Sequence, residues 1–221
     1  MGSTVSKKTV FDEATFGPGL DSALEAHEHD PDYDGRLLRG ERTRRHIALA
    51  MIDLIEEGNP RPTARLIAER AGVSLRLVFH HFDDVEEVFQ EGAIVQAQRY
   101  WRRVVRIPPT GPVAQRIDAV CRQRRQLYVS ISPVRRAVVS RAAESESIQT
   151  ILSVARRRLR EELAATFEPE LSGVGTEAPI LLDAIELAAS WEAWDGQRSN
   201  GHRSAAAAQR VMNYTLTALL T

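Results

Sequence analysis

The chain has 221 residues, 43% of them hydrophobic, and a formal net charge of −1 at pH 7. This composition suffices for a buried core, and the charge excludes a chain that is basic over its whole length. The single cysteine, Cys121, excludes a disulfide framework and a cysteine-rich zinc site, and favours a cytoplasmic location. Because Ala, Leu, Arg and Glu dominate and alternating β-branched runs are few, we expect an all-α protein.

The N-terminal segment, residues 1–38, is rich in acids and poor in aliphatic side chains. We predict a mostly disordered acidic tail, with a short helix from about Leu20 to His27. The run His27-Glu28-His29-Asp30 contains residue types that bind metals. It lacks evident partners elsewhere, so a solvated polar run is the other interpretation, and we predict neither a metal site nor a cofactor.

A first amphipathic helix is predicted from Glu41 to about Glu57, where Gly58-Asn59-Pro60 ends it. The next segment, Thr63 to Phe82, predicts two short helices joined by a tight turn. The first of these runs from about Ala64 to Arg70, with Thr63 as its N-cap and with Leu66 and Ile67 facing inward.

In the turn, Gly72 is the residue that can take a positive φ. Ser74 caps the second helix, whose apolar positions follow the helical spacing: Leu75, Val78, Phe79 and Phe82. Two helices joined by a short turn that contains glycine indicate a helix-turn-helix motif, whose second helix can enter the DNA major groove. Two ordinary helices of a bundle are the alternative.

Charge around this motif favours nucleic acid. Residues 36–82 contain nine basic side chains and five acidic ones. The basic set is Arg36, Arg39, Arg42, Arg44, Arg45, Arg61, Arg65, Arg70 and Arg76; the acidic set is Glu41, Asp53, Glu56, Glu57 and Glu69. A locally basic head on a near-neutral chain is typical of a DNA-binding domain.

Further amphipathic helices follow the motif. Asp83 is expected to cap a long helix, with Glu86 completing a capping box, and the prolines of residues 108–112 break the chain. The helices expected after this break are Val113 to Ser130, Pro133 to Ala143, Glu146 to Phe167, Pro179 to Asp195 and Ser204 to Leu220, with a loop from Glu168 to Glu177. We see no apolar run long enough to span a membrane and predict no membrane partner.

The last two of these helices are apolar over most of their circumference, so they need partners on two sides. A second copy of the chain is the simplest partner, and we predict a homodimer through a four-helix bundle. A central helix in a monomer is the alternative. The predicted interface residues are Leu181, Ile185, Ala188, Trp191, Val211, Met212, Thr215 and Leu219.

The stretch TARLIAERAGVSLRLVFHHF, followed by an acid-capped long helix, resembles the head of the tetracycline-repressor (TetR) family of bacterial regulators. The closing segment SWEAWDGQRSN…AAAAQRVMNYTLTALL resembles the dimerising helices of that family. The resemblance implies residues 39–98 as the DNA-binding domain, with the motif at 63–82, and residues 99–221 as a ligand-binding and dimerisation domain. It implies a repressor rather than an enzyme, bound to a palindromic operator as a homodimer and released by a small molecule.

Site residues carry over from the resemblance by position. Leu75, Arg76 and Phe79 would face base edges, and His80 would reach a base or a phosphate. The residues expected to hold the DNA backbone are Thr63, Arg65, Ser74 and His81, with Arg42, Arg44 and Arg45 adding phosphate contacts. Val73 and Val78 would fill the small core of the head.

Three positions depart from the family pattern. Many members have threonine at Leu77, tyrosine at Phe79 and a lysine near Val85, and each of these supplies a phosphate contact. The alternative function is therefore a helical small-molecule-binding protein with a vestigial DNA-binding head.

The ligand pocket is the least defined part of the chain. Candidate lining residues are Trp101, Cys121, Tyr128, Phe167 and Trp191, and plain core packing is the alternative for each. The arginines Arg122, Arg124, Arg125, Arg135 and Arg136 would favour an anionic ligand or, alternatively, lie on solvated faces.

Overall fold

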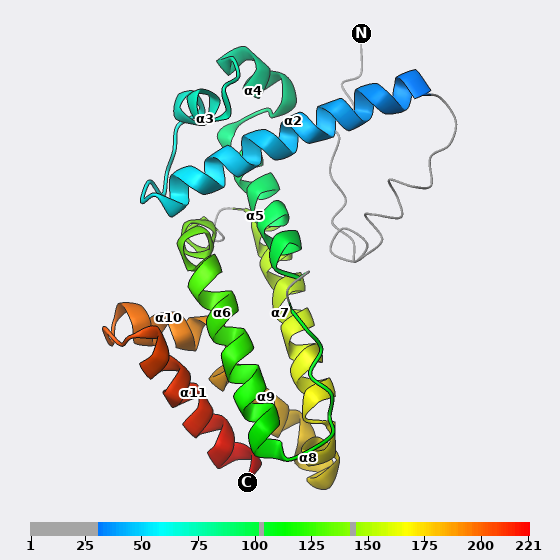
Figure 1. Ribbon diagram of the computed structural model, residues 1–221, viewed down its shortest axis with the longest axis vertical. Coiled ribbons are helices and arrows are strands. Elements are labelled where there is room, and N and C mark those ends of the chain that lie inside the picture. Colours follow the sequence, from blue (N-terminus) through cyan, green and yellow to red (C-terminus); the bar gives the residue numbers. More distant parts are fainter. Residues whose placement is uncertain (1–30, 102–103, 142–144) are drawn as a thin grey trace. The chain divides into compact units, whose positions relative to one another are not determined.

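A computed structural model describes residues 31–101, 104–141 and 145–221 (Figure 1). Over these residues the chain is all-α, as predicted, and contains no β-strand. The chain divides into two compact units, Met1–Gln98 with Val138–Val154, and Arg99–Ala137 with Ala155–Thr221. The helix predicted around residues 20–27 and the polar run at 27–30 lie outside the described residues, and the domain limits at 38 and 98 stay a prediction.

The first unit contains α2 (Pro31–Glu56), α3 (Ala64–Ala71), α4 (Leu75–His81) and most of α5 (Val85–Trp101). The helix expected from Glu41 thus begins at Pro31, and residues 31–38, which we assigned to the disordered tail, are helical. Proline suits the first helical position because its missing N–H would have no partner there. The buried side chains of this unit include Ile47, Met51, Ile67, Val78, Phe82 and Phe89.

Helices α5 and α2 approach each other closely at Gly92. A Cβ built on Gly92 of α5 would lie 2.1 Å from the terminal methyl of Met51 on α2. Met51 is fully buried, so its methyl group fills the space that a side chain at residue 92 would need.

The capping box of α5 lies one residue later than predicted. The Glu87 N–H donates to Asp84 Oδ1 at 2.8 Å, and the Glu87 carboxylate accepts from the Asp83 N–H at 2.8 Å. Asp84 therefore takes the capping role expected of Asp83, while the Glu87 carboxylate binds the N–H of Asp83, the residue before the cap. Both pairs of acids have the three-residue spacing of a capping box. The residue at which the helix begins decides which pair is used.

The second unit contains most of α6 (Val113–Val139), the later turns of α7 (Glu146–Thr166), and a C-terminal group of short helices. This group comprises α8 (Glu168–Gly173), the 3-10 helix η3 (Gly175–Glu177), α9 (Ala178–Ala188), α10 (Trp191–Ser199) and α11 (Ala205–Leu220). The expected helices at 146–167 and 204–220 are confirmed as α7 and α11, each within one residue. The expected loop at 168–177 is wrong, because α8 and η3 occupy it.

Pro133 does not divide α6, which contradicts the two helices expected there. Proline removes one helical hydrogen bond, but the buried neighbours Ser132 and Val134 hold the helix in the core. Ser132 Oγ donates to the Tyr128 carbonyl at 2.6 Å and accepts from Trp191 Nε1 at 3.1 Å. Tertiary contacts on both sides of the proline thus offset the lost hydrogen bond.

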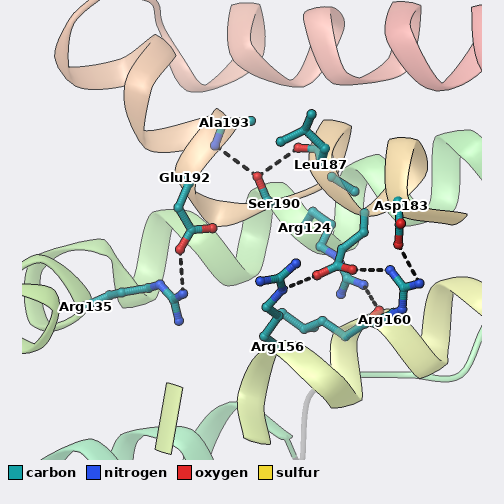
Figure 2. Close-up of polar contacts among 12 residues, drawn as sticks. Arg124, Arg135, Arg156, Arg160, Asp183, Leu187, Ser190, Glu192 and Ala193 are labelled. Atoms are coloured by element: carbon teal, nitrogen blue, oxygen red, sulfur yellow. Dashed lines mark hydrogen bonds and ion pairs between the residues drawn. The ribbon is translucent and has the colours of Figure 1, made fainter. Parts of the chain in front are cut away.

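The single helix expected from Pro179 to Asp195 is two helices, α9 and α10, separated at Ala189 and Ser190. Ser190 Oγ accepts from the Ala193 N–H at 3.1 Å and donates to the Leu187 carbonyl at 2.8 Å (Figure 2). The buried Tyr128 hydroxyl donates to the Ala189 carbonyl at 2.6 Å. These bonds satisfy groups that the end of α9 and the start of α10 leave free.

None of the helices in the described part of the chain has both the length and the apolar character that spanning a membrane requires.

Candidate nucleic-acid interface

The predicted helix-turn-helix is present as α3 and α4, and local capping defines both helices. Thr63 Oγ1 accepts from the Leu66 N–H at 3.4 Å at the start of α3. Gly72 ends α3 with a φ of +64°, and the Val73 N–H donates to the Ala68 carbonyl at 3.0 Å. This left-handed residue is the conformation for which glycine is favoured, and it reverses the chain toward α4.

Ser74 begins α4 by accepting from the Leu77 N–H at 3.1 Å. Within this helix only Val78 is buried. Leu75 and Phe79 are 43% and 49% exposed, and Arg76 and His80 are also exposed. The four residues that we expected to face DNA therefore lie on the solvent side of α4, while Val78 anchors the helix to the unit.

Leu66 differs from the expectation. It is 39% exposed, whereas its neighbour Ile67 is fully buried. Adjacent helical residues point about 100° apart, so a helix that presents a narrow stripe to the core buries only one of two such neighbours. The prediction that both face inward is wrong for Leu66.

Arg44 has internal partners rather than a free guanidinium. It donates to the His81 carbonyl, to Glu87 Oε1 at 2.9 Å and to Glu91 Oε2 at 3.4 Å. The guanidinium carbon lies 4.2 Å from the centroid of the Phe82 ring. These contacts join α2, the end of α4 and the start of α5. A phosphate would have to compete with them for Arg44, whose phosphate-binding role stays a prediction.

The other arginines of the head fall into two groups. Arg65 pairs with Glu69, and Arg70 with Glu57, in exposed ion pairs, and Arg45 Nη1 donates to Gln98 Oε1 at 3.3 Å. Among the described residues, no ion pair or side-chain hydrogen bond occupies the guanidinium groups of four exposed arginines, Arg39, Arg42, Arg61 and Arg76. Arg61 is thus a free cation of the head that the predicted DNA-binding residues omit. Its membership of the basic set of residues 36–82 was the signal that could have identified it.

Three histidines lie at or contact the ends of α3 and α4. His46 Nε2 lies 2.9 Å from the Ala71 carbonyl and ties the end of α3 to α2. The rings of His80 and His81 meet edge to face with centroids 5.2 Å apart. Burial, together with the nearby His80 and Arg44, lowers the pKa of His81, so that a neutral ring is favoured beside Arg44.

In the second unit, four of the five candidate pocket residues are buried in one hydrophobic cluster: Cys121, Tyr128, Phe167 and Trp191. Trp101 is half-buried. Burial raises the pKa of the Cys121 thiol to about 12, so this cysteine is not a reactive thiolate. The assignment of these residues to a ligand pocket stays a prediction.

Some of the predicted dimer residues are also buried within the protomer. Ile185, Trp191 and Met212 are buried within the protomer, so they cannot supply contact surface to a second copy. The other five, Leu181, Ala188, Val211, Thr215 and Leu219, are partly exposed, and their interface role stays a prediction. The same helices also expose apolar side chains outside the predicted set: Ile180 (64%) and Leu187 (70%) on α9, and Tyr214 (79%) on α11. Sequence reasoning could not separate these sets because α9 is apolar on nearly every side.

A partly buried layer of ion pairs, which the sequence did not predict, joins α6, α7 and α9. Arg124, fully buried, donates to Glu162 Oε2 at 2.8 Å and to the Leu159 carbonyl at 3.1 Å. Glu186 on α9 accepts from Arg156 and Arg160 of α7 (Figure 2). Arg124 therefore lies neither on a solvated face nor free for an anionic ligand.

No protein-family model and no curated protein matches the chain. Among solved structures, a transcriptional regulator from Rhodococcus sp. Rha1 superposes with a TM-score of 0.62 at 24% identity, covering 80% of this chain and 95% of that one. A protein from Mesorhizobium loti MAFF303099, provisionally named a TetR-family transcriptional regulator, superposes with a TM-score of 0.57 at 19% identity, covering 82% and 96%. This chain has the fold of these two proteins.

Proposed function

We propose that the protein is a sequence-specific DNA-binding transcriptional regulator of the TetR type. The observation that carries this proposal is the exposed face of α4, which presents Leu75, Arg76, Phe79 and His80 from a capped helix-turn-helix. Arg76 has no internal carboxylate partner among the described residues, so its guanidinium is free to bind guanine O6 and N7. The remaining predicted contacts, Thr63, Arg65 and Ser74, are exposed at the start of the two helices, where they would set the register on the DNA backbone.

The test is a fluorescence-anisotropy titration of the full chain against duplexes selected from a randomised library, at two salt concentrations. Arg76→Ala should weaken binding to the selected duplex by about 1–3 kcal/mol. Arg203→Ala, an exposed arginine in the loop before α11, makes the same change in net charge outside the head and serves as the control. Equal losses in the two variants would count against α4 as the reading helix.

The finer proposal is a homodimeric repressor that binds a palindromic operator and is released by a small molecule. Exposed apolar side chains on α9 and α11 support the dimer, because contact with a second copy would remove their apolar surface from water. Leu187→Arg should shift the protein from dimer to monomer in sedimentation velocity, and Val174→Arg, the same kind of change at an exposed apolar residue between α8 and η3, should not. A wild-type chain that sediments as a monomer would remove the palindromic operator from the proposal.

One observation favours a second function, a helical small-molecule-binding protein whose head no longer reads DNA. Leu77, Phe79 and Val85 carry no phosphate-binding group, and the carboxylates of Asp83 and Asp84 are exposed nearby. Ligand binding by a protein that fails to bind any selected duplex at low salt would support this function.

A further inference from the structure

The exposed face of α4 is divided between apolar and basic side chains. At about 100° per residue, Leu75, Phe79, Arg76 and His80 follow one another around roughly 140° of the helix. Leu75 and Phe79 form one edge of this face, and Arg76 and His80 form the other. Val78 is the buried residue of α4, whereas a large part of each side chain of the apolar pair remains open to solvent.

The apolar pair needs an occupant, because a leucine at 43% exposure and a phenylalanine at 49%, one turn apart, present a continuous apolar strip to water. The charges beside Leu75 and Phe79 indicate which kind of partner can cover the pair. Alpha4 contains no acidic residue, and Arg76, Arg42 and Arg61 are exposed cations without an internal partner among the described residues. This combination fits an anionic partner that also offers apolar groups.

In the major groove of DNA, the C5-methyl of thymine is the apolar group on the base edges. We propose that Leu75 and Phe79 read thymine methyl groups, and that they form the specificity-determining apolar half of the recognition helix beside Arg76. This inference rests on the proposed DNA-binding function and deepens it. Phe79 then serves base recognition instead of supplying the phosphate-binding hydroxyl that a tyrosine would provide.

The spacing of the pair defines the sequence that it reads. One helical turn advances about 5.4 Å, and base pairs are stacked about 3.4 Å apart. Side chains one turn apart along a helix in the groove therefore reach bases one or two steps apart. We expect each half-site to contain two thymines separated by at most one base pair.

The experiment replaces thymine with deoxyuracil, which removes the methyl and leaves the base-pairing edge unchanged. A duplex selected from a randomised library with the full-length chain is titrated by fluorescence anisotropy, with each thymine replaced in turn. Loss of one contacted methyl should weaken binding about threefold to fourfold, the effect of exposing one methyl-sized group. Two such positions are expected in each half-site.

Variants then assign the contacts. Leu75→Ala and Phe79→Ala should each abolish the thymine-to-uracil difference at one position, and circular dichroism should show that these exposed changes leave the fold intact. Leu66→Ala, a matched exposed leucine on α3, and Arg76→Ala should both keep the difference.

The outcomes separate the two proposals. Tight, salt-dependent binding that ignores every uracil substitution overturns the methyl-reading inference and leaves the regulator standing. Absence of binding to any selected duplex overturns both. If Leu75→Ala and Phe79→Ala change the oligomeric state and not DNA affinity, a protein surface covers this strip and the inference is wrong.

Discussion

Arg44 and Glu87 form an ion pair of 2.9 Å that joins α2 to the first turn of α5. The same guanidinium donates to the His81 carbonyl at the end of α4 and lies over the Phe82 ring. Arg44 therefore connects α4 to α2 and α5. Its side chain is 26% exposed, so solvent screens the pair only in part.

This connection predicts how Arg44→Ala differs from Arg42→Ala. Arg44→Ala should lower the free energy of unfolding by about 1–2 kcal/mol, because it removes hydrogen bonds to charged groups that are partly screened. It should weaken DNA binding without changing the slope of log K against log salt, because no phosphate contact is lost. Arg42→Ala, at an exposed arginine, should reduce that slope by about 0.9. If Arg44→Ala and Arg42→Ala changed the salt slope equally, Arg44 would be a phosphate-binding residue.

Substitution of Gly72 tests the turn between α3 and α4, because the Gly72 φ of +64° lies in the left-handed region. Nothing lies within 4 Å of a Cβ built there, so Gly72→Ala adds backbone strain without a steric clash. Thermal unfolding should show a loss of about 1–2 kcal/mol, with a smaller loss for Gly72→Asn. Gly173→Ala, where the added Cβ also meets open space, is the matched control. A comparable loss at residue 173 would mean that backbone strain is not the cause.

The buried pair of Arg124 and Glu162 predicts strong coupling between two substitutions. Their side chains are 1% and 10% exposed. Arg124→Met leaves the Glu162 carboxylate buried without its ion-pair partner and should cost about 3–5 kcal/mol. Arg124→Met with Glu162→Leu should restore much of that stability, because the double variant buries no unpaired charge. Additive losses in the double-variant cycle, measured by urea unfolding, would contradict this account.

Acid should weaken the attachment of α8 to α6 through Glu170. Two hydrogen bonds, of 2.7 and 2.5 Å, join its carboxylate to the Arg116 guanidinium. These bonds lower the pKa of Glu170 more than burial raises it. A carboxyl whose pKa is lowered on folding stabilises the protein above its unfolded pKa of about 4.3, and that contribution is lost as the pH falls through the lower folded pKa.

Glu170→Gln should therefore destabilise the protein by about 2 kcal/mol at pH 7, and the difference from wild type should shrink below about pH 4. Urea unfolding at pH 7, 5 and 3 measures the difference. Glu161→Gln, on an exposed face of α7, is the control. If the Glu170→Gln difference stayed constant across this range, the ion pair with Arg116 would not be its source.

The motif that carries the proposed function was predictable because its determinants are local. Thr63, Gly72 and Ser74 act on backbone groups within four residues of themselves, so their roles as caps and turn follow from spacing alone. The same locality explains why α7 and α11 were placed within one residue. The one-residue error at the start of α5 shows the limit, since Asp83 and Asp84 offer equivalent local signals.

Sequence alone therefore determined the all-α class and the two helices of the motif, whereas the exposure of Leu75 and Phe79 on α4 was expected only from the family resemblance. Tertiary structure decided the properties that depend on partners distant in the chain: the ion pair of Arg44 with Glu87, the continuity of α6 through Pro133 and the break between α9 and α10. It also decided which apolar side chains of α9 and α11 face the core and which, such as Leu187 and Tyr214, remain on the surface. Helical periodicity specifies which residues share a face, but only the packing of other helices specifies which face is covered.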